Sequence, residues 1–118
     1  MSWTLRTCVT LILSLLVISF APAAGAGDDS PVFEATIADL QAMMETGEMS
    51  AEAITKAYLD RIERLNPELN AVIVTNPDAV AQARALDTER REGTVRGSLH
   101  GIPVLLKDNI ESRDRMAT

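Results

Sequence analysis

The sequence has 118 residues, of which 47% are hydrophobic and 24% are charged, a composition that fits one modest globular domain and excludes a disordered or fibrous chain. Seventeen acidic residues against eleven basic ones give a net charge of -6 at pH 7, which repels phosphate backbones. Beyond residue 26 the aromatic residues are Phe33 and Tyr58, too few for a platform on which nucleobases stack. We therefore expect no nucleic-acid partner.

Residue types that bind metals and cofactors are also scarce. The sequence holds one cysteine, Cys8, and one histidine, His100, which together form neither a disulfide nor a zinc-type ligand set. The four-residue spacing of Gly93, Gly97 and Gly101 matches neither a dinucleotide-binding fingerprint nor a P-loop. We expect no metal and no cofactor.

The N-terminus has the three parts of a secretory signal. Arg6 precedes an uninterrupted apolar run over residues 8–20, and small residues follow at 21–26. The run is shorter than the roughly 20 residues that a spanning helix needs. We predict a signal peptide over residues 1–26, cleaved after Ala26, with no stable membrane anchor. The protein is then exported, periplasmic or secreted, with an uncleaved anchor as the alternative.

Two helices are predicted at the start of the remaining segment, residues 27–118. Thr36 followed by Asp39 resembles a capping box, and that helix should end near Gly47. Ser50 can cap a second helix, which the Asn66-Pro67 pair should stop. Its apolar residues fall on one face at helical spacing: Ile54, Ala57, Tyr58, Ile62 and Leu65.

A strand and a third helix are predicted next. Residues 69–75 contain a β-branched run too short for a helix. Asn76 can then cap a helix that has Pro77 at its first position and Arg90 and Arg91 at its negative end.

A glycine-punctuated loop leads into a second predicted strand at residues 102–106. This run is apolar on both faces, as in a strand buried inside an α/β sheet. Such a strand needs neighbours on both edges and helices on both faces, and the elements predicted here do not supply them. We therefore interpret the chain as an α/β fragment whose sheet is incomplete.

Lys107, directly after the second strand, is the candidate catalytic residue. Open α/β sheets place their ligand crevices at the carboxyl ends of strands. Burial of an ammonium group favours its neutral form, which can accept a proton near neutral pH. The alternative is that Lys107 pairs with Asp108 at a solvated strand end and has no further role.

Other polar and sulfur-containing residues have simpler interpretations. His100, beside a glycine in a turn, is typical of a backbone hydrogen-bonding partner rather than a base. The adjacent pair Met43-Met44 is typical of core filling. The acidic pairs Asp28-Asp29 and Glu45-Glu48 are expected at the surface.

Residues 97–110, GSLHGIPVLLKDNI, resemble the start of the amidase-signature domain. The likeness extends back through residues 50–65, the 69–72 segment and the alanine-rich helix, and forward through residues 114–118. In that family a lysine belongs to a serine, cis-serine, lysine triad that hydrolyses amides through an acyl-enzyme. The resemblance implies that Lys107 is this lysine, and that the substrate is a small amide or a peptide amide. It also implies the N-terminal part of the amidase-signature fold, a mixed sheet core covered by helices that is incomplete in this chain.

The same resemblance implies that the bridging and nucleophilic serines lie beyond Thr118, so that the chain by itself is inactive. Ser50, Ser98 and Ser112 do not match either serine, and Ser98 stands where the family often has proline. Two alternatives stay open. One is a protein like the glutamine-hydrolysing A subunit of an amidotransferase; the other is a secreted binding protein or a truncated gene relic.

Overall fold

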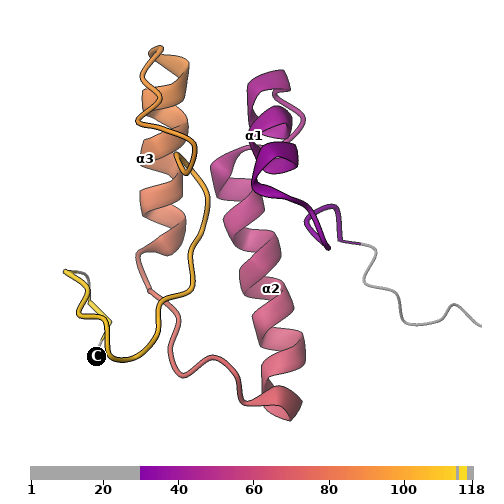
Figure 1. Cartoon of the computed structure of the whole chain (residues 1–118), viewed down its shortest axis with the longest axis vertical. Helices are drawn as coiled ribbons and strands as arrows, with labels where there is room; N and C mark the ends of the chain where they lie inside the picture. The colour runs from indigo at the N-terminus through magenta and orange to yellow at the C-terminus, as the bar shows by residue number, and fades with distance from the viewer. Residues whose placement is uncertain (1–29, 114, 117–118) are drawn as a thin grey trace, which may run out of the picture.

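The computed structural model describes residues 30–113, 115 and 116, and its regular elements are helices. Three helices follow one another along the chain: α1, Ile37–Thr46; α2, Ala51–Leu69; and α3, Ala79–Arg91. Helices α2 and α3 pack side by side, and α1 lies across the start of α2 (Figure 1). After α3 the chain turns back and runs beside that helix in the opposite direction, so that the segment after His100 returns toward the start of α3 (Figure 1).

The start of α1 forms the predicted capping box. The Thr36 hydroxyl accepts a hydrogen bond from the Asp39 N–H at 3.2 Å, and the Asp39 carboxylate accepts one from the Thr36 N–H at 2.9 Å. The Asp39 carboxylate also accepts from the Thr36 hydroxyl at 2.6 Å, and this bond, together with the one from the Thr36 N–H, lowers the pKa of the Asp39 carboxyl. The helix ends at Gly47, as predicted, and the φ of this glycine is left-handed at 76°.

The start of α2 also agrees with the sequence, but its end does not. Ser50 caps the helix by accepting from the Ala53 N–H at 3.0 Å. The prediction that Asn66-Pro67 stops the helix was wrong, because α2 continues to Leu69 with Pro67 inside it. The helix closes at Asn70, which is left-handed at φ 50° and donates its N–H to the Asn66 carbonyl at 2.8 Å. One proline in a last turn removes a single donor, and the left-handed cap still closes the turn.

Helix α3 begins two residues later than its predicted first position. The prediction that Asn76 is the N-cap was wrong, because Asp78 holds that position and makes no side-chain cap hydrogen bond. The Asn76 side chain instead accepts from the Asp78 N–H at 2.8 Å in the turn before Ala79. Pro77 lies in that turn. Arg90 and Arg91 occupy the last turn, as predicted.

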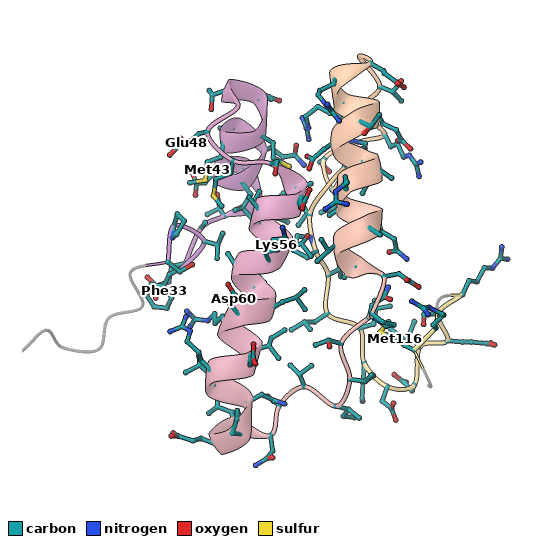
Figure 2. All side chains as sticks on the ribbon, turned by 180° about the vertical axis from the view of Figure 1, so that it is seen from behind. Phe33, Met43, Glu48, Lys56, Asp60 and Met116 are labelled. Atoms are coloured by element: carbon teal, nitrogen blue, oxygen red, sulfur yellow. The ribbon has the colours of Figure 1, made fainter. Side chains whose placement is uncertain are left out.

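The core is small and lies where the three helices meet. Its buried members come from the segment before α1 and from all three helices: Val32, Leu40, Met44, Ala51, Ile54 and Ala83. Met43 packs partly buried against them, which confirms the expectation that the methionine pair fills core space. Glu45 and Glu48 are exposed, as expected (Figure 2).

The two predicted strands do not form within the described residues, which contain no strand. In residues 102–106 the last three are exposed, with Leu105 75% exposed, and Ile73 in the first segment is 80% exposed. Val72 pairs its N–H and carbonyl with the side-chain amide of Asn66, both at 2.8 Å, rather than with another strand. A strand exists by pairing with a neighbour, and none lies beside these segments here. The mixed sheet core therefore stays a prediction.

The predicted signal peptide, residues 1–26, and the pair Asp28-Asp29 lie outside the described residues. Within the described part of the chain, no helix is both long enough and apolar enough to cross a membrane.

Helix α2 receives a second cap from α3. The Asp87 carboxylate accepts hydrogen bonds from the N–H groups of Ala51, at 2.7 Å, and Glu52, at 2.9 Å. A carboxylate at a helix N-terminus satisfies free donors and complements the positive end of the dipole. The Asp87 side chain therefore links α3 to the start of α2 by hydrogen bonds.

Replacing Asp87 by alanine is expected to lower the free energy of unfolding by about 2 kcal/mol, because two helix N–H groups lose their acceptor. Urea unfolding followed by circular dichroism measures this. Asp60→Ala, on the exposed face of α2 (Figure 2), is the control and should change stability little. Equal losses in the two variants would show that the cap contributes nothing.

Candidate active site

The loop that precedes Lys107 is held by the buried side chain of His100. The ring Nδ1 accepts from the Arg96 N–H at 3.4 Å, and Nε2 lies 3.0 Å from the Leu86 carbonyl oxygen. Nε2 must carry the proton to donate to that carbonyl, so the geometry assigns a neutral imidazole. His100 is 4% exposed. The expectation that His100 bonds to backbone groups is confirmed.

Two further side chains hold the carbonyl groups of the same loop. The Gln41 amide, from α1, donates to the Ser98 carbonyl at 2.8 Å and to the His100 carbonyl at 3.0 Å. Arg90, from α3, donates to the His100 carbonyl at 3.1 Å and to the Gln41 side-chain oxygen at 2.7 Å. We call this arrangement the Gln41–Arg90 clamp.

The loop also makes a close backbone approach to α1 and α2. Gly101 is left-handed, with φ at 83°, and a Cβ there would lie 2.9 Å from the Ala51 Cβ and 3.0 Å from the Met44 sulfur. Glycine is therefore required both by the backbone angle and by the space. This contact and the clamp determine where the extended segment leaves the core.

Lys107 ends that extended segment and is exposed. Its carbonyl accepts from the Ile110 N–H at 2.9 Å, which closes a turn directly after the lysine. The expectation that Lys107 is buried was wrong for this chain, because the apolar residues before it, Val104, Leu105 and Leu106, are themselves uncovered. The alternative pairing with Asp108 is not observed either: within the described range no ion pair joins Lys107 to another residue.

An ion pair fastens the segment beyond Lys107 to the start of α3. Arg115 forms a two-pronged contact with Asp78, with Nε 2.7 Å from one carboxylate oxygen. Met116 accordingly lies near the start of α3 (Figure 2). The Arg115 guanidinium holds the pKa of the Asp78 carboxyl below its usual value. Lys107 is thus placed between a polar clamp on one side and an ion pair on the other.

A second ion-pair cluster joins α2 to α3 away from Lys107. Glu52 accepts from Arg84, at 3.0 and 2.8 Å, and from Lys56 at 2.8 Å. Hydrogen bonds from Arg84 first, and then from Lys56, lower the pKa of Glu52 to about 2. The side chains of Arg84 and Lys56 are more than half exposed, which is typical of a structural surface cluster.

The depressed pKa of Glu52 predicts a stability term that depends on pH. The folded pKa lies below the ordinary value of 4.5, so the contribution is complete above pH 4.5 and is lost as the pH falls toward 2. The difference in unfolding free energy between the wild type and Glu52→Gln should therefore shrink over that window. Urea titrations at several pH values measure it, and added salt should reduce it. A difference that stays constant from pH 6 to about 2 would contradict the linkage.

Comparison with known proteins identifies the family. The family model described as Amidase matches residues 53–118, which include α3, the clamped loop and Lys107. The chain belongs to the amidase-signature family. The resemblance of residues 97–110 to the start of the amidase-signature domain is thereby confirmed.

Two proteins similar to this chain have comparable sequence identities to it. A Schizosaccharomyces pombe protein named as an amidase is 45% identical over 85 residues, covering 72% of this chain and 15% of that protein. The A subunit of glutamyl-tRNA(Gln) amidotransferase from Methylococcus capsulatus is 49% identical over 74 residues, covering 62% of this chain and 15% of the subunit.

A solved amidase-signature structure matches as well. The native peptide amidase of Stenotrophomonas maltophilia is 52% identical, with a TM-score of 0.68, over 70% of this chain and 18% of the peptide amidase. Another structure of the peptide amidase is a complex with the competitive inhibitor chymostatin. The chain thus spans less than a fifth of the length of these relatives. The likeness to the peptide amidase supports an α/β fold for the family, whereas the regular elements among the described residues of this chain are helices.

Ser50, Ser98 and Ser112 lie in different places. Ser50 caps α2, and the Ser98 carbonyl is held by Gln41. Ser112 lies beyond the turn at Lys107. The residues that sequence reasoning missed are Gln41, Arg90 and Asp87. Each acts across more than 30 residues of sequence or between helices, and no local spacing signals such a contact.

Proposed function

We propose that this chain forms the N-terminal part of an amidase that hydrolyses a small carboxylic amide or a peptide amide. The observation that carries the proposal is the family match over residues 53–118, which includes Lys107 and the segment that leads into it. The 52% identity to a peptide amidase supports the peptide-amide substrate class.

In the proposed mechanism Lys107 is the base of a serine, cis-serine, lysine triad. Neutral lysine takes a proton from the bridging serine, which takes one from the nucleophilic serine. The serine oxygen then attacks the amide carbon, and the proton returns along the same route to the departing amine as the C–N bond breaks. Water hydrolyses the acyl-enzyme in a second cycle. This route needs no histidine, which agrees with the structural role of His100.

The exposed apolar residues around Lys107 support a larger enzyme. Val104, Leu105 and Leu106 are 62%, 75% and 50% exposed, a contiguous run that a protein of this composition does not leave in water. Burial of these residues in a sheet would also desolvate Lys107 and favour its neutral form. Both serines are proposed to lie in the part of the enzyme beyond Thr118, so this chain alone is expected to be inactive.

We further propose that the enzyme is exported. The arginine, the apolar run and the small residues of positions 1–26 support a signal peptide, and a periplasmic or secreted amidase follows from it. Edman sequencing of the exported protein should begin at Gly27. An N-terminus at Met1 in a cytosolic protein would overturn this proposal.

The test is to express the complete reading frame that contains this chain and to assay it on a panel of simple amides, peptide amides and glutamine. Release of ammonia from simple or peptide amides supports the proposal. Hydrolysis of glutamine alone would favour the second candidate, an A subunit of an amidotransferase, to which the chain is 49% identical over 74 residues. A folded full-length protein that hydrolyses none of these would overturn both and leave a binding protein.

A further inference from the structure

The clamp holds backbone groups that have no other partner within the loop. The carbonyls of Ser98 and His100 both point at the single side-chain amide of Gln41, and the His100 carbonyl also accepts from Arg90. The His100 carbonyl is part-buried and so needs donors, which two side chains from different helices supply, whereas the bond to the Ser98 carbonyl is exposed. These hydrogen bonds therefore hold the loop against both α1 and α3.

Gln41 is the central residue of the Gln41–Arg90 clamp, because its side chain both donates and accepts hydrogen bonds. The Gln41 nitrogen donates to the loop, whereas its oxygen accepts from Arg90 at 2.7 Å. Arg90 in turn leaves its Nε buried without a hydrogen-bond partner in the described structure, a cost that offsets part of what its other bonds contribute. The arrangement thus contributes more to the geometry of the loop than to net stability.

The clamped loop is continuous with the segment that carries Lys107. Ile102 donates its N–H to the Leu99 carbonyl at 3.1 Å and packs partly buried against the core, after which residues 103–107 run out in extended form. Lys107 follows the partly buried Ile102 by five residues, so the backbone position of the loop sets where the segment that carries Lys107 starts. A shift of the loop would therefore shift the start of that segment.

We propose that Gln41 and Arg90 are positioning residues that place Lys107 for proton transfer. The inference rests on the proposed function, since it assigns a role in the same reaction. Neither residue contacts the substrate or the reacting atoms. Their effect is exerted through the backbone of residues 98–107, and it is expected in kcat rather than in KM, because the position of the base matters in the transition state.

The test uses Gln41→Glu in the full-length enzyme. Glutamate has the shape of glutamine and keeps an acceptor for Arg90, but it cannot donate to the Ser98 and His100 carbonyls. We expect kcat to fall about 10- to 100-fold with KM unchanged, the loss typical of a catalytic group displaced by about 1 Å. The matched control is Gln82→Glu, the same change at the other glutamine of the sequence, on the exposed face of α3.

The outcomes separate this inference from the proposed function. Wild-type kcat in Gln41→Glu, beside an inactive Lys107→Ala, would overturn the positioning role and leave the proposed function standing. Wild-type kcat in Lys107→Ala would overturn the proposed function itself.

If Gln41→Glu does not fold, two Arg90 variants test the positioning role instead. Arg90→Lys keeps a cation that can donate to Gln41 or to the His100 carbonyl, and Arg90→Met keeps the aliphatic stem alone. Values of kcat that fall from wild type to lysine to methionine, at constant KM and with thermal stability preserved, support the inference. Equal kcat in all three would overturn it.

Discussion

Replacing Lys107 by alanine is expected to lower the kcat of the full-length enzyme for amide hydrolysis by roughly 10⁴-fold or more, the scale of removing one member of a catalytic unit. The physical reason is that a serine hydroxyl attacks slowly unless a base accepts its proton. The side chain of Lys107 is exposed in this chain and makes no ion pair with another described residue, so its removal should not cost stability. Initial rates on a peptide amide, with thermal unfolding alongside, measure both quantities.

The matched control for this variant is Lys56→Ala, because Lys56 is the other lysine in the sequence. Lys56 lies on α2 (Figure 2) and bonds to Glu52 rather than to any residue of the Gln41–Arg90 clamp. Its removal should leave kcat unchanged and affect stability by less than about 1 kcal/mol, as expected for an exposed pair. Equal losses of activity in the two lysine variants would point to a general effect of charge and against a base.

The second large effect is expected at Gly101. Gly101→Ala should lower the free energy of unfolding by roughly 3 kcal/mol, from left-handed strain plus overpacking of the core. The new methyl group would meet the Ala51 Cβ at 2.9 Å, and Ala51 has no rotamer with which to move away. Because the core has few buried members, this loss would lower the melting temperature by roughly 10 °C or more.

Gly93→Ala isolates the two causes. Gly93 has a similar φ, 86°, but a Cβ there meets nothing within 4 Å. It should therefore lose only the strain term, about 1 kcal/mol. Thermal melts of both variants provide the comparison, and equal losses would mean that the close approach of Gly101 to Ala51 costs nothing.

Local signals carried most of the successful fold predictions. The capping box at Thr36, the left-handed end at Gly47 and the cap at Ser50 each depend on residues within four positions of one another. The end of α2 was missed because Asn66-Pro67 is a local stop signal, and the bonds made by Asn66 and Asn70 carry the helix past it.

The two predicted strands do not form among the described residues, and the reason is different. The apolar pattern of residues 102–106 describes what the segment would bury, but pairing and burial come from other elements. Without such neighbours among the described residues the same segment is extended and uncovered. The pattern therefore indicates the environment in a complete fold rather than in this chain.

Of the candidate site, only the segment that contains Lys107 could be predicted from the sequence. Lys107 was found because it follows an apolar run and lies in a segment that resembles a known family. Gln41 and Arg90 carried no signal, since a glutamine and an arginine 49 residues apart are ordinary helix-surface residues until the fold brings them together. The assignment of Lys107 as the base remains a prediction.

The most direct measurement of the central claim is the amide hydrolysis rate of a chimera. In it, residues of this chain replace the matching segment of the Stenotrophomonas maltophilia peptide amidase, to which they are 52% identical. We predict that the chimera hydrolyses peptide amides and that Lys107→Ala abolishes this activity while the protein stays folded. A folded chimera that is inactive, or whose activity does not depend on Lys107, would contradict the account.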